Sequence, residues 1–211
     1  MPTDSPDSYL TIANSVKAEP QKTKGSRFIG EALPVETEEE ARERLGTVRR
    51  REHAATHHCW AYRLGPAGDT FQYSDDGEPN GSAGRPIFRQ IEGRELTNVL
   101  VVVTRYYGGT KLGTGGLVRA YGEAAGLVLD EAPKHEVIVR VPLRLRFAFA
   151  DTSPAMHTIG KFDVEIAETN YSGEGTEMLV NVRRSEVERL DAAFVEALGG
   201  RGDVVEISSD M

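Results

Sequence analysis

The chain has 211 residues, of which 39% are hydrophobic and 27% charged, an ordinary composition for a soluble globular protein. Its formal net charge of −8 argues against a generally basic nucleic-acid binder. The longest apolar run, Val99 to Val103, is too short to span a membrane, and the first residues lack the basic and apolar segments of a secretory signal. A single cysteine excludes an internal disulfide and fits a reducing compartment, so we expect a cytoplasmic protein.

Charge is unevenly distributed along the chain. Residues 1–135 hold 17 basic and 19 acidic side chains, whereas residues 136–211 hold 8 and 14. Together with a predicted boundary at Pro133-Lys134, this predicts two domains, 1–134 and 135–211. Any contact with a polyanion should come mainly from the first domain, because the second is acidic throughout.

The first domain is expected to mix strands and helices. Thr37-Glu38-Glu39-Glu40 predicts a capping box, with Thr37 as N-cap and Glu40 as its reciprocal partner, and the arginine-rich stretch 42–51 is interpreted as a solvated helix face. The other predicted elements are strands over 9–18 and 26–35, a hairpin of 58–64 with 69–74, a helix over 85–92, a buried strand over 98–104 and a helix ending near 131.

The second domain has a complete pattern of its own. We predict a long strand over 136–150, a helix over 153–162, a hairpin of 164–171 with 176–182, a helix capped by 185–188 and a strand over 203–207. This βαββαβ order is the ferredoxin-like, split βαβ pattern. The fold class is therefore predicted as α+β.

The stretch from Val99 to Arg119, VLVVVTRYYGGTKLGTGGLVR, predicts a strand, a glycine-rich loop and a helix. This arrangement aims backbone N–H groups at an anion, and no acid occurs between Asn98 and Gly122. The residues predicted to bind the anion are Arg105, Gly108, Gly109, Lys111, Gly113, Gly115, Gly116 and Arg119. The alternative is that the glycines only permit a tight turn and close helix packing.

A second polar loop, DDGEPNGSAG over residues 75–84, precedes another predicted helix. Its predicted oxyanion ligands are Asn80, Gly81, Ser82, Gly84 and Arg85. The loop's carboxylates, Asp75, Asp76 and Glu78, could instead hold a hard cation, but their spacing does not match an EF-hand. We therefore expect no metal and no cofactor.

Several other side chains are weighed as supporting groups. His57 and His58 should point to opposite faces of a strand, and one of them could line the anion site, whereas Cys59 is interpreted as a small buried side chain rather than a nucleophile. Arg27 would matter only if the fold brings it to the glycine loops. The aromatic residues considered for stacking on a base are Trp60, Tyr106, Tyr107 and Tyr121.

The motifs KGSRFIG, ATHHCWAY, YSDDGEPNGSAGRP and VVVTRYYGGTKLGTGGLVRAYG, in this order, resemble the IMPACT/YigZ family over most of residues 22–125. The resemblance implies a first domain like domain 2 of ribosomal protein S5 and a ferredoxin-like domain after it. This pair is similar to the last two domains of elongation factor G, which implies contact with RNA or the ribosome. Eukaryotic members are linked to translational control through a protein partner, and we expect this chain to differ from them in having no N-terminal RWD domain. The family supplies no catalytic residues to carry over.

These observations lead us to expect a translation-linked regulatory protein that grips the phosphate of RNA, ribosome or nucleotide with its glycine-rich loops. We also consider a protein partner in translational control, and we expect neither membrane binding nor sequence-specific recognition of DNA. Two alternatives stay open. One is a small-molecule hydrolase or transferase using the region of His57, Asp75, Asp76 and Glu78. The other is a protein-interaction module in which the glycines are structural.

Overall fold

The computed structural model describes residues 6–207 of the chain. The chain divides into two compact units, residues 1–137 and 138–211. The division lies three residues beyond the boundary predicted from sequence. None of the helices within residues 6–207 is both long enough and apolar enough to cross a membrane. Mixed helices and antiparallel sheets give the α+β class expected from the sequence.

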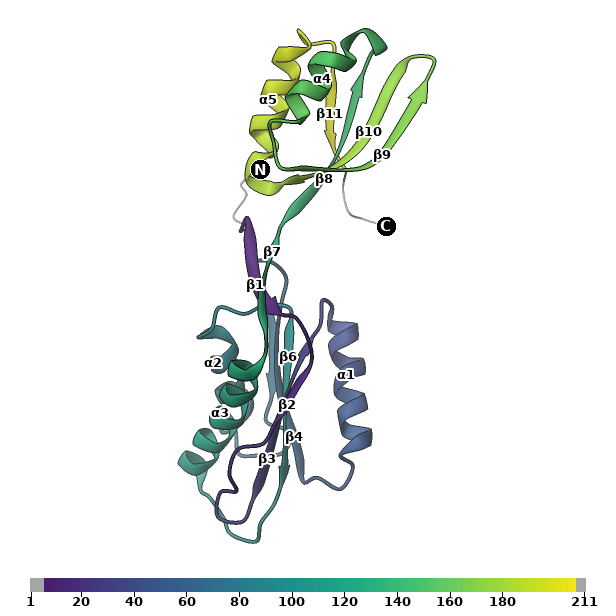
Figure 1. The fold of residues 1–211 in the computed structure, drawn as a ribbon. Helices are drawn as coiled ribbons and strands as arrows, with labels where there is room; N and C mark the ends of the chain where they lie inside the picture. Colours follow the sequence, from purple (N-terminus) through teal and green to yellow (C-terminus); the bar gives the residue numbers. More distant parts are fainter. Residues whose placement is uncertain (1–5, 208–211) are drawn as a thin grey trace. The chain divides into compact units, whose positions relative to one another are not determined.

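The first unit is built around a five-stranded sheet in the order β2-β3-β6-β4-β5, in which all neighbours are antiparallel. Helix α1 covers one face and helices α2 and α3 the other (Figure 1). Its elements are β1 (Ser8–Ile12), β2 (Val16–Ala18), β3 (Arg27–Pro34), α1 (Glu38–Arg51), β4 (His57–Leu64), β5 (Thr70–Ser74), α2 (Gly84–Glu92), β6 (Val99–Tyr106), α3 (Thr114–Glu131) and β7 (Lys134–Ile138), whose last residue belongs to the second unit.

Strand β6 is the centre of this sheet, and both of its faces are buried. Val101 and Val103 pack in the core under α2 and α3, whereas Leu100 and Val102 pack in the core under α1. A strand buried on both faces has no need of polar alternation, which explains why its sequence is a continuous apolar run. The strand also extends two residues beyond the predicted end at Thr104 and so includes Arg105.

The N-terminal strand and the cap of α1 differ from prediction. The strand expected over 9–18 breaks into β1 and β2, and β1 pairs with β7 rather than joining the five-stranded sheet. The Thr37 Oγ1 accepts from the Glu40 N–H at 3.1 Å, as predicted, but the Glu40 carboxylate accepts from the Glu36 N–H. Arg42 and Arg44 pair with glutamates one turn earlier on α1, which favours the solvated helix face over a nucleic-acid patch.

The second unit has a four-stranded antiparallel sheet in the order β11-β8-β10-β9. Helices α4 and α5 pack on one face of it around Leu145, Val180 and Phe194 (Figure 1). Its elements are β8 (Arg140–Phe147), the 3-10 turn η1 (Phe149–Asp151), α4 (Thr152–Ile159), β9 (Val164–Ser172), β10 (Gly175–Arg183), the 3-10 turn η2 (Arg184–Glu186), α5 (Val187–Ala197) and β11 (Asp203–Glu206).

Two predictions for the second unit need correction. The single strand expected over 136–150 is divided between two strands, β7, which ends at Ile138, and β8, which begins at Arg140. Phe149, expected in the strand, lies in η1 with an exposed ring. Glu186 occupies the N-cap position of α5 because the preceding residues form η2.

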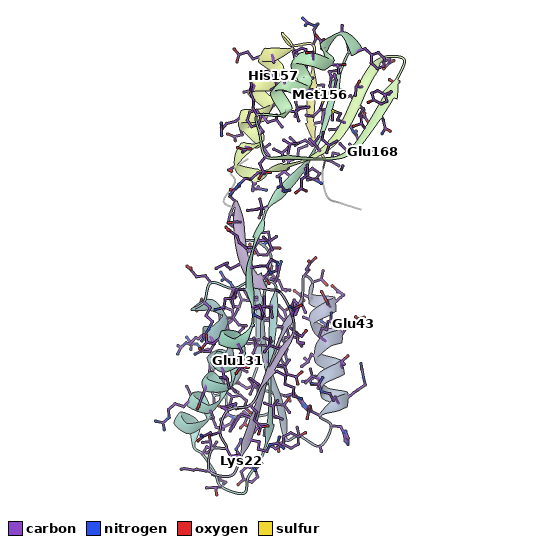
Figure 2. The ribbon with its side chains drawn as sticks, in the orientation of Figure 1. Lys22, Glu43, Glu131, Met156, His157 and Glu168 are labelled. Atoms are coloured by element: carbon purple, nitrogen blue, oxygen red, sulfur yellow. The ribbon has the colours of Figure 1, made fainter. Side chains whose placement is uncertain are left out.

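On the outer surfaces charged side chains reach solvent, as Glu43 on α1 and Glu131 on α3 illustrate (Figure 2).

Candidate anion-binding site

Helices α2 and α3 lie side by side and run in the same direction. Gln90 of α2 approaches Gly122 and Gly126 of α3, and one turn further along Arg94 donates to the Asp130 carboxylate at 2.8 Å. The earlier residue, Gln90, meets earlier residues of α3, and the later residue, Arg94, meets a later one, so the two segments run parallel. The two N-termini therefore lie at the same end of the sheet, with the glycine-rich loops that precede them.

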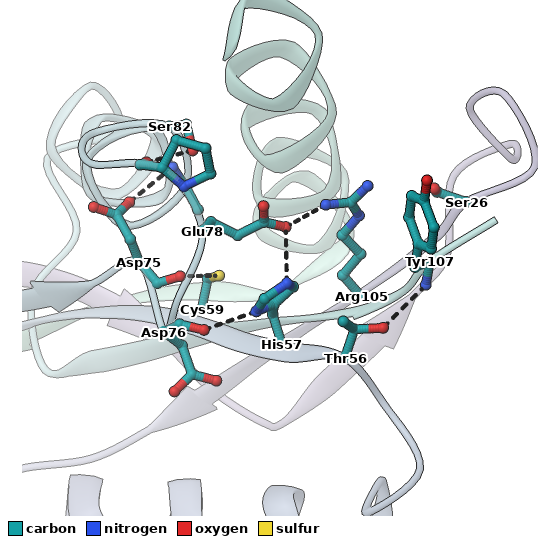
Figure 3. A network of polar contacts seen from close by, with 12 residues as sticks. Ser26, Thr56, His57, Cys59, Asp75, Asp76, Glu78, Ser82, Arg105 and Tyr107 are labelled. Atoms are coloured by element: carbon teal, nitrogen blue, oxygen red, sulfur yellow. Dashed lines mark hydrogen bonds and ion pairs between the residues drawn. The ribbon is translucent and has the colours of Figure 1, made fainter. Parts of the chain in front are cut away.

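The two loops meet at the buried carboxylate of Glu78. Glu78 comes from the loop before α2, and its Oε1 accepts from Arg105 Nη1 of β6 at 2.5 Å (Figure 3). The same oxygen accepts from the Tyr121 hydroxyl of α3 at 2.8 Å. Both members of the ion pair are almost fully buried, with 6% of the Arg105 side chain and 4% of the Glu78 side chain exposed. The Arg105 guanidinium also lies 5.4 Å from the centre of the Tyr107 ring. These contacts join the loop before α2 to strand β6 and helix α3.

The role predicted for Arg105 needs correction. We expected it to be free for phosphate because no acid lies near it in sequence, but Glu78, 27 residues earlier, is its partner. Arg27 is likewise committed elsewhere, because its guanidinium pairs with Glu19 at 2.7 Å instead of reaching the glycine loops. The Nε of Arg105 is buried with no hydrogen-bond partner.

The N-terminus of α2 is filled by the chain's own carboxylate. Asp75 Oδ1 accepts from the N–H groups of Ala83 and Gly84 at 2.9 and 2.8 Å, and its Oδ2 accepts from the Gly81 N–H at 2.8 Å. The Ser82 hydroxyl donates to the Pro79 carbonyl at 2.6 Å. The amides and the hydroxyl predicted to hold an external oxyanion are thus engaged inside the protein, and Asp75 stands where such an anion would be bound.

The N-terminus of α3 is open by comparison. Its N-cap is Gly113, no side chain caps it, and its first turn contains no acid. Gly109 and Gly113 have φ of 85° and 72°, in the left-handed region that glycine adopts without strain. Thr114 and Gly115 are exposed at the start of the helix, so the orphan N–H groups of this turn face solvent.

Two exposed cations flank this open turn. Lys111 lies in the loop and Arg119 on the second turn of α3, and neither forms an ion pair with any residue within 6–207. Arg85 on α2 is exposed and equally without an ionic partner in the described part of the chain. The pairing of Gln90 and Arg94 with α3 puts Arg85 level with Arg119. The arrangement suits a phosphate or another oxyanion.

The glycines of the loop divide into two kinds. A Cβ on Gly108 would lie 2.0 Å from the Gly25 carbonyl carbon, and the Gly108 N–H donates to the Ser26 hydroxyl at 3.1 Å, so this glycine serves packing. A Cβ on Gly115 would meet nothing within 4 Å, and the same holds for Gly109 and Gly113. Backbone conformation accounts for Gly109 and Gly113, whose φ is positive, whereas neither packing nor backbone conformation accounts for Gly115, where a ligand could approach closely. Gly116 has only the Leu112 side chain nearby.

The neighbouring histidines lie on opposite faces of β4, as predicted. His57 Nδ1 is 2.8 Å from the Asp76 carbonyl oxygen, so this nitrogen carries the hydrogen, and Nε2 lies 3.8 Å from Glu78 Oε1 (Figure 3). His58 is buried on the α1 side, where burial lowers its pKa, and its Nε2 lies 3.2 Å from the Glu52 carbonyl. Only His57 reaches the site.

Asp76 and Cys59 serve the structure. The Asp76 carboxylate accepts from the His58 N–H at 2.7 Å and pairs with Arg49 at 2.9 Å. Burial raises the pKa of the Cys59 thiol to about 12, and the thiol donates to the Asp75 carbonyl. The prediction that Cys59 is a small buried side chain is confirmed. Within residues 6–207, no group of three or more His, Cys, Asp or Glu side chains could hold a metal ion.

Of the aromatic residues predicted to stack on a base, only Tyr107 is exposed, with 48% of its surface accessible. Tyr121 is fully buried, and burial raises its pKa. Tyr106 donates its hydroxyl to Glu52, and Trp60 stacks on Tyr62. Two further rings on β5, Phe71 and Tyr73, are exposed although they were not predicted as binding residues; their only signal in the sequence is alternation with polar residues along an edge strand.

Comparison with known proteins gives consistent matches. The sequence model of the Impact N-terminal domain matches residues 24–129. An IMPACT family member from Thermus thermophilus is 43% identical over 71% of this chain and 80% of its own length, and the member YvyE from Bacillus subtilis is 33% identical over 94% and 91%. A crystal structure described as that of a hypothetical protein is similar with a TM-score of 0.69 at 29% identity, covering 97% of this chain and 99% of the other.

Proposed function

Because the chain belongs to the IMPACT family, we propose that it is a translation-linked regulatory protein that binds the phosphates of RNA, ribosome or nucleotide at the open N-terminus of α3. The observation that carries the proposal is the contrast between adjacent helix ends. Asp75 satisfies the amides of α2, whereas the first turn of α3 has no capping side chain and no acid.

In this proposal, the α3 amides bind one phosphate and nearby cations bind its neighbours. Thr114, Gly115 and Gly116 supply N–H groups, and Lys111, Arg119 and Arg85 supply charge. Arg105 acts beneath the loop, where its pair with Glu78 ties β6 to the α2 loop and to Tyr121. Binding of this kind needs no turnover.

The topology of the units supports the link to translation. The order β11-β8-β10-β9 and the sequence βαββαβ favour a ferredoxin-like second unit, and the first unit suits a fold like domain 2 of ribosomal protein S5. Two such domains in succession resemble the last domains of elongation factor G. Through this resemblance we infer RNA or ribosome contact, a possible protein partner in translational control, and a place in the cytoplasm.

The test is filter binding of a short RNA at several salt concentrations to the full chain carrying Lys111→Ala and Arg119→Ala. Each lost phosphate contact should reduce the salt slope by about 0.7 for a single strand, and affinity at low salt should fall. Arg42→Ala with Arg44→Ala is the matched control, because it removes the same charge from α1. Equal affinity in both double variants would contradict the proposal.

An enzyme acting on a small phosphorylated molecule is the second candidate, and one observation favours it. His57 donates from Nδ1 to the Asp76 carbonyl, so Nε2 is the ring nitrogen left to exchange a proton with a bound molecule. Asp75 and Asp76 are engaged with the backbone and with Arg49, and Glu78 is paired with Arg105, which leaves His57 for such chemistry. Tight binding of a phosphorylated metabolite, with RNA affinity unchanged in the loop variants, would favour this candidate.

A further inference from the structure

Strand β5 at the edge of the five-stranded sheet carries two exposed aromatic rings. Phe71 and Tyr73 are 51% and 42% exposed, although both point to the face that α2 covers. Neither ring belongs to the hydrophobic core of the unit. Exposed aromatic side chains placed together indicate a contact surface rather than a contribution to folding.

A buried ring holds these two in place from behind. Phe88 of α2 is 8% exposed, and its ring centre lies 4.7 Å from that of Phe71 and 5.9 Å from that of Tyr73. The Phe71 and Phe88 rings are nearly parallel, with an interplanar angle of 25°. One side of the aromatic pair is therefore supported by the helix, and the other faces solvent. We call Phe71, Tyr73 and Phe88 the β5 platform.

Charge beside the β5 platform is positive at the end where α2 begins, which is also the end of the sheet where α3 begins. The Gly84 backbone packs closely on that of Ser74, so Arg85, the next residue, begins beside the Tyr73 end of β5. Arg85 and Arg89 are exposed one turn apart on α2, and neither forms an ion pair with a residue among those the structure describes. Glu92 lies at the far end of the helix. Aromatic faces beside free arginines are the combination that binds single-stranded nucleic acid.

We propose that the β5 platform stacks the unpaired bases of single-stranded RNA whose phosphates lie along Arg85, Arg89 and the open end of α3. The inference rests on the proposed function and narrows its ligand to single strands. Phe71 and Tyr73 are two residues apart on a strand, hence about 6–7 Å apart, so each ring can receive a separate base. A duplex keeps its bases paired and stacked and cannot offer them to the rings.

The experiment compares two probes, a short unstructured RNA and the duplex that it forms with its complement. Phe71→Leu with Tyr73→Leu keeps apolar bulk but removes the ring faces, and should lower single-strand affinity about tenfold for each base that loses its ring, with duplex affinity unchanged. The control is Phe149→Leu with Tyr171→Leu, which removes the exposed stacked pair of the second unit. Phe71→Tyr with Tyr73→Phe should retain single-strand affinity, and thermal melts verify folding.

Several outcomes would overturn the inference. These are unchanged single-strand affinity in the Phe71 and Tyr73 leucine variant, an equal loss for the duplex, or an equal loss in the control pair. A wild-type dimer that the same leucine variant dissociates would show that a second copy covers the β5 platform. If loss of Lys111 and Arg119 weakens both probes while the leucine variant weakens neither, the proposed function stands and the stacking role fails. If wild-type protein binds neither probe, both fail.

Discussion

Two helices of the first unit begin side by side, and their N-termini are completed in opposite ways. At α2, Asp75 accepts three backbone N–H groups and so supplies the anion that the helix end attracts. At α3 the N-cap is Gly113, no side chain among the described residues caps the helix, and the nearest charges along the sequence are those of Lys111 and Arg119. The comparison teaches that a glycine-rich loop before a helix is not by itself an anion site, because a carboxylate in the loop can complete the helix end.

The largest effect is expected at the ion pair that joins the two helix ends. Arg105→Ala leaves the Glu78 carboxylate buried without its cation, which should cost about 3–5 kcal/mol of unfolding free energy. Arg27→Ala on the neighbouring strand is the control, because its pair with Glu19 is exposed to solvent and should contribute far less to stability. Chemical denaturation measures both, and similar small losses would mean that the pair does not hold the loops together.

Emptying the filled end should have the next largest effect. Asp75→Ala removes the acceptor of three N–H groups, so we expect a loss of about 2–3 kcal/mol in unfolding free energy. Asp75→Asn retains an oxygen acceptor and should lose less. A thermal melt that ranks the alanine variant at or above the asparagine variant would contradict the capping role of this carboxylate.

A carboxylate added to the first turn of α3 should make this helix end resemble that of α2. Gly115→Asp places a carboxylate in the first turn of α3, where a Cβ meets nothing within 4 Å. The substitution should stabilise the protein by about 0.5 kcal/mol and weaken RNA binding, because the carboxylate competes with phosphate for the same amides. Gly115→Asn has nearly the same size without the charge. If the two variants bind RNA equally well, the amides of α3 do not contact phosphate.

The smallest change in stability is expected where charge is removed from the open end. Lys111→Ala with Arg119→Ala should alter the free energy of unfolding by no more than about 0.5 kcal/mol, because both side chains are exposed and neither is paired within residues 6–207. Denaturation of this double variant beside wild type measures the difference. A loss above about 1.5 kcal/mol, closer to that expected for Arg105→Ala, would show that these cations have a structural role.

The sequence alone determined the local parts of this protein. Thr37 predicted the start of α1, the run from Val99 predicted the buried strand β6, and Cys59 was predicted to be a buried side chain. These features depend on neighbours within a few residues, where capping and periodicity act. The motifs also predicted the family to which the chain belongs.

Only the tertiary structure decided which polar groups are free. Arg105 and Glu78 are 27 residues apart in sequence, and the fold buries them against each other. Asp75 reaches the amides of α2 only because its loop folds back on the helix, and Phe71 is exposed only because β5 is the edge of the sheet. Charge pairing and exposure depend on contacts between distant segments, and no local pattern records them.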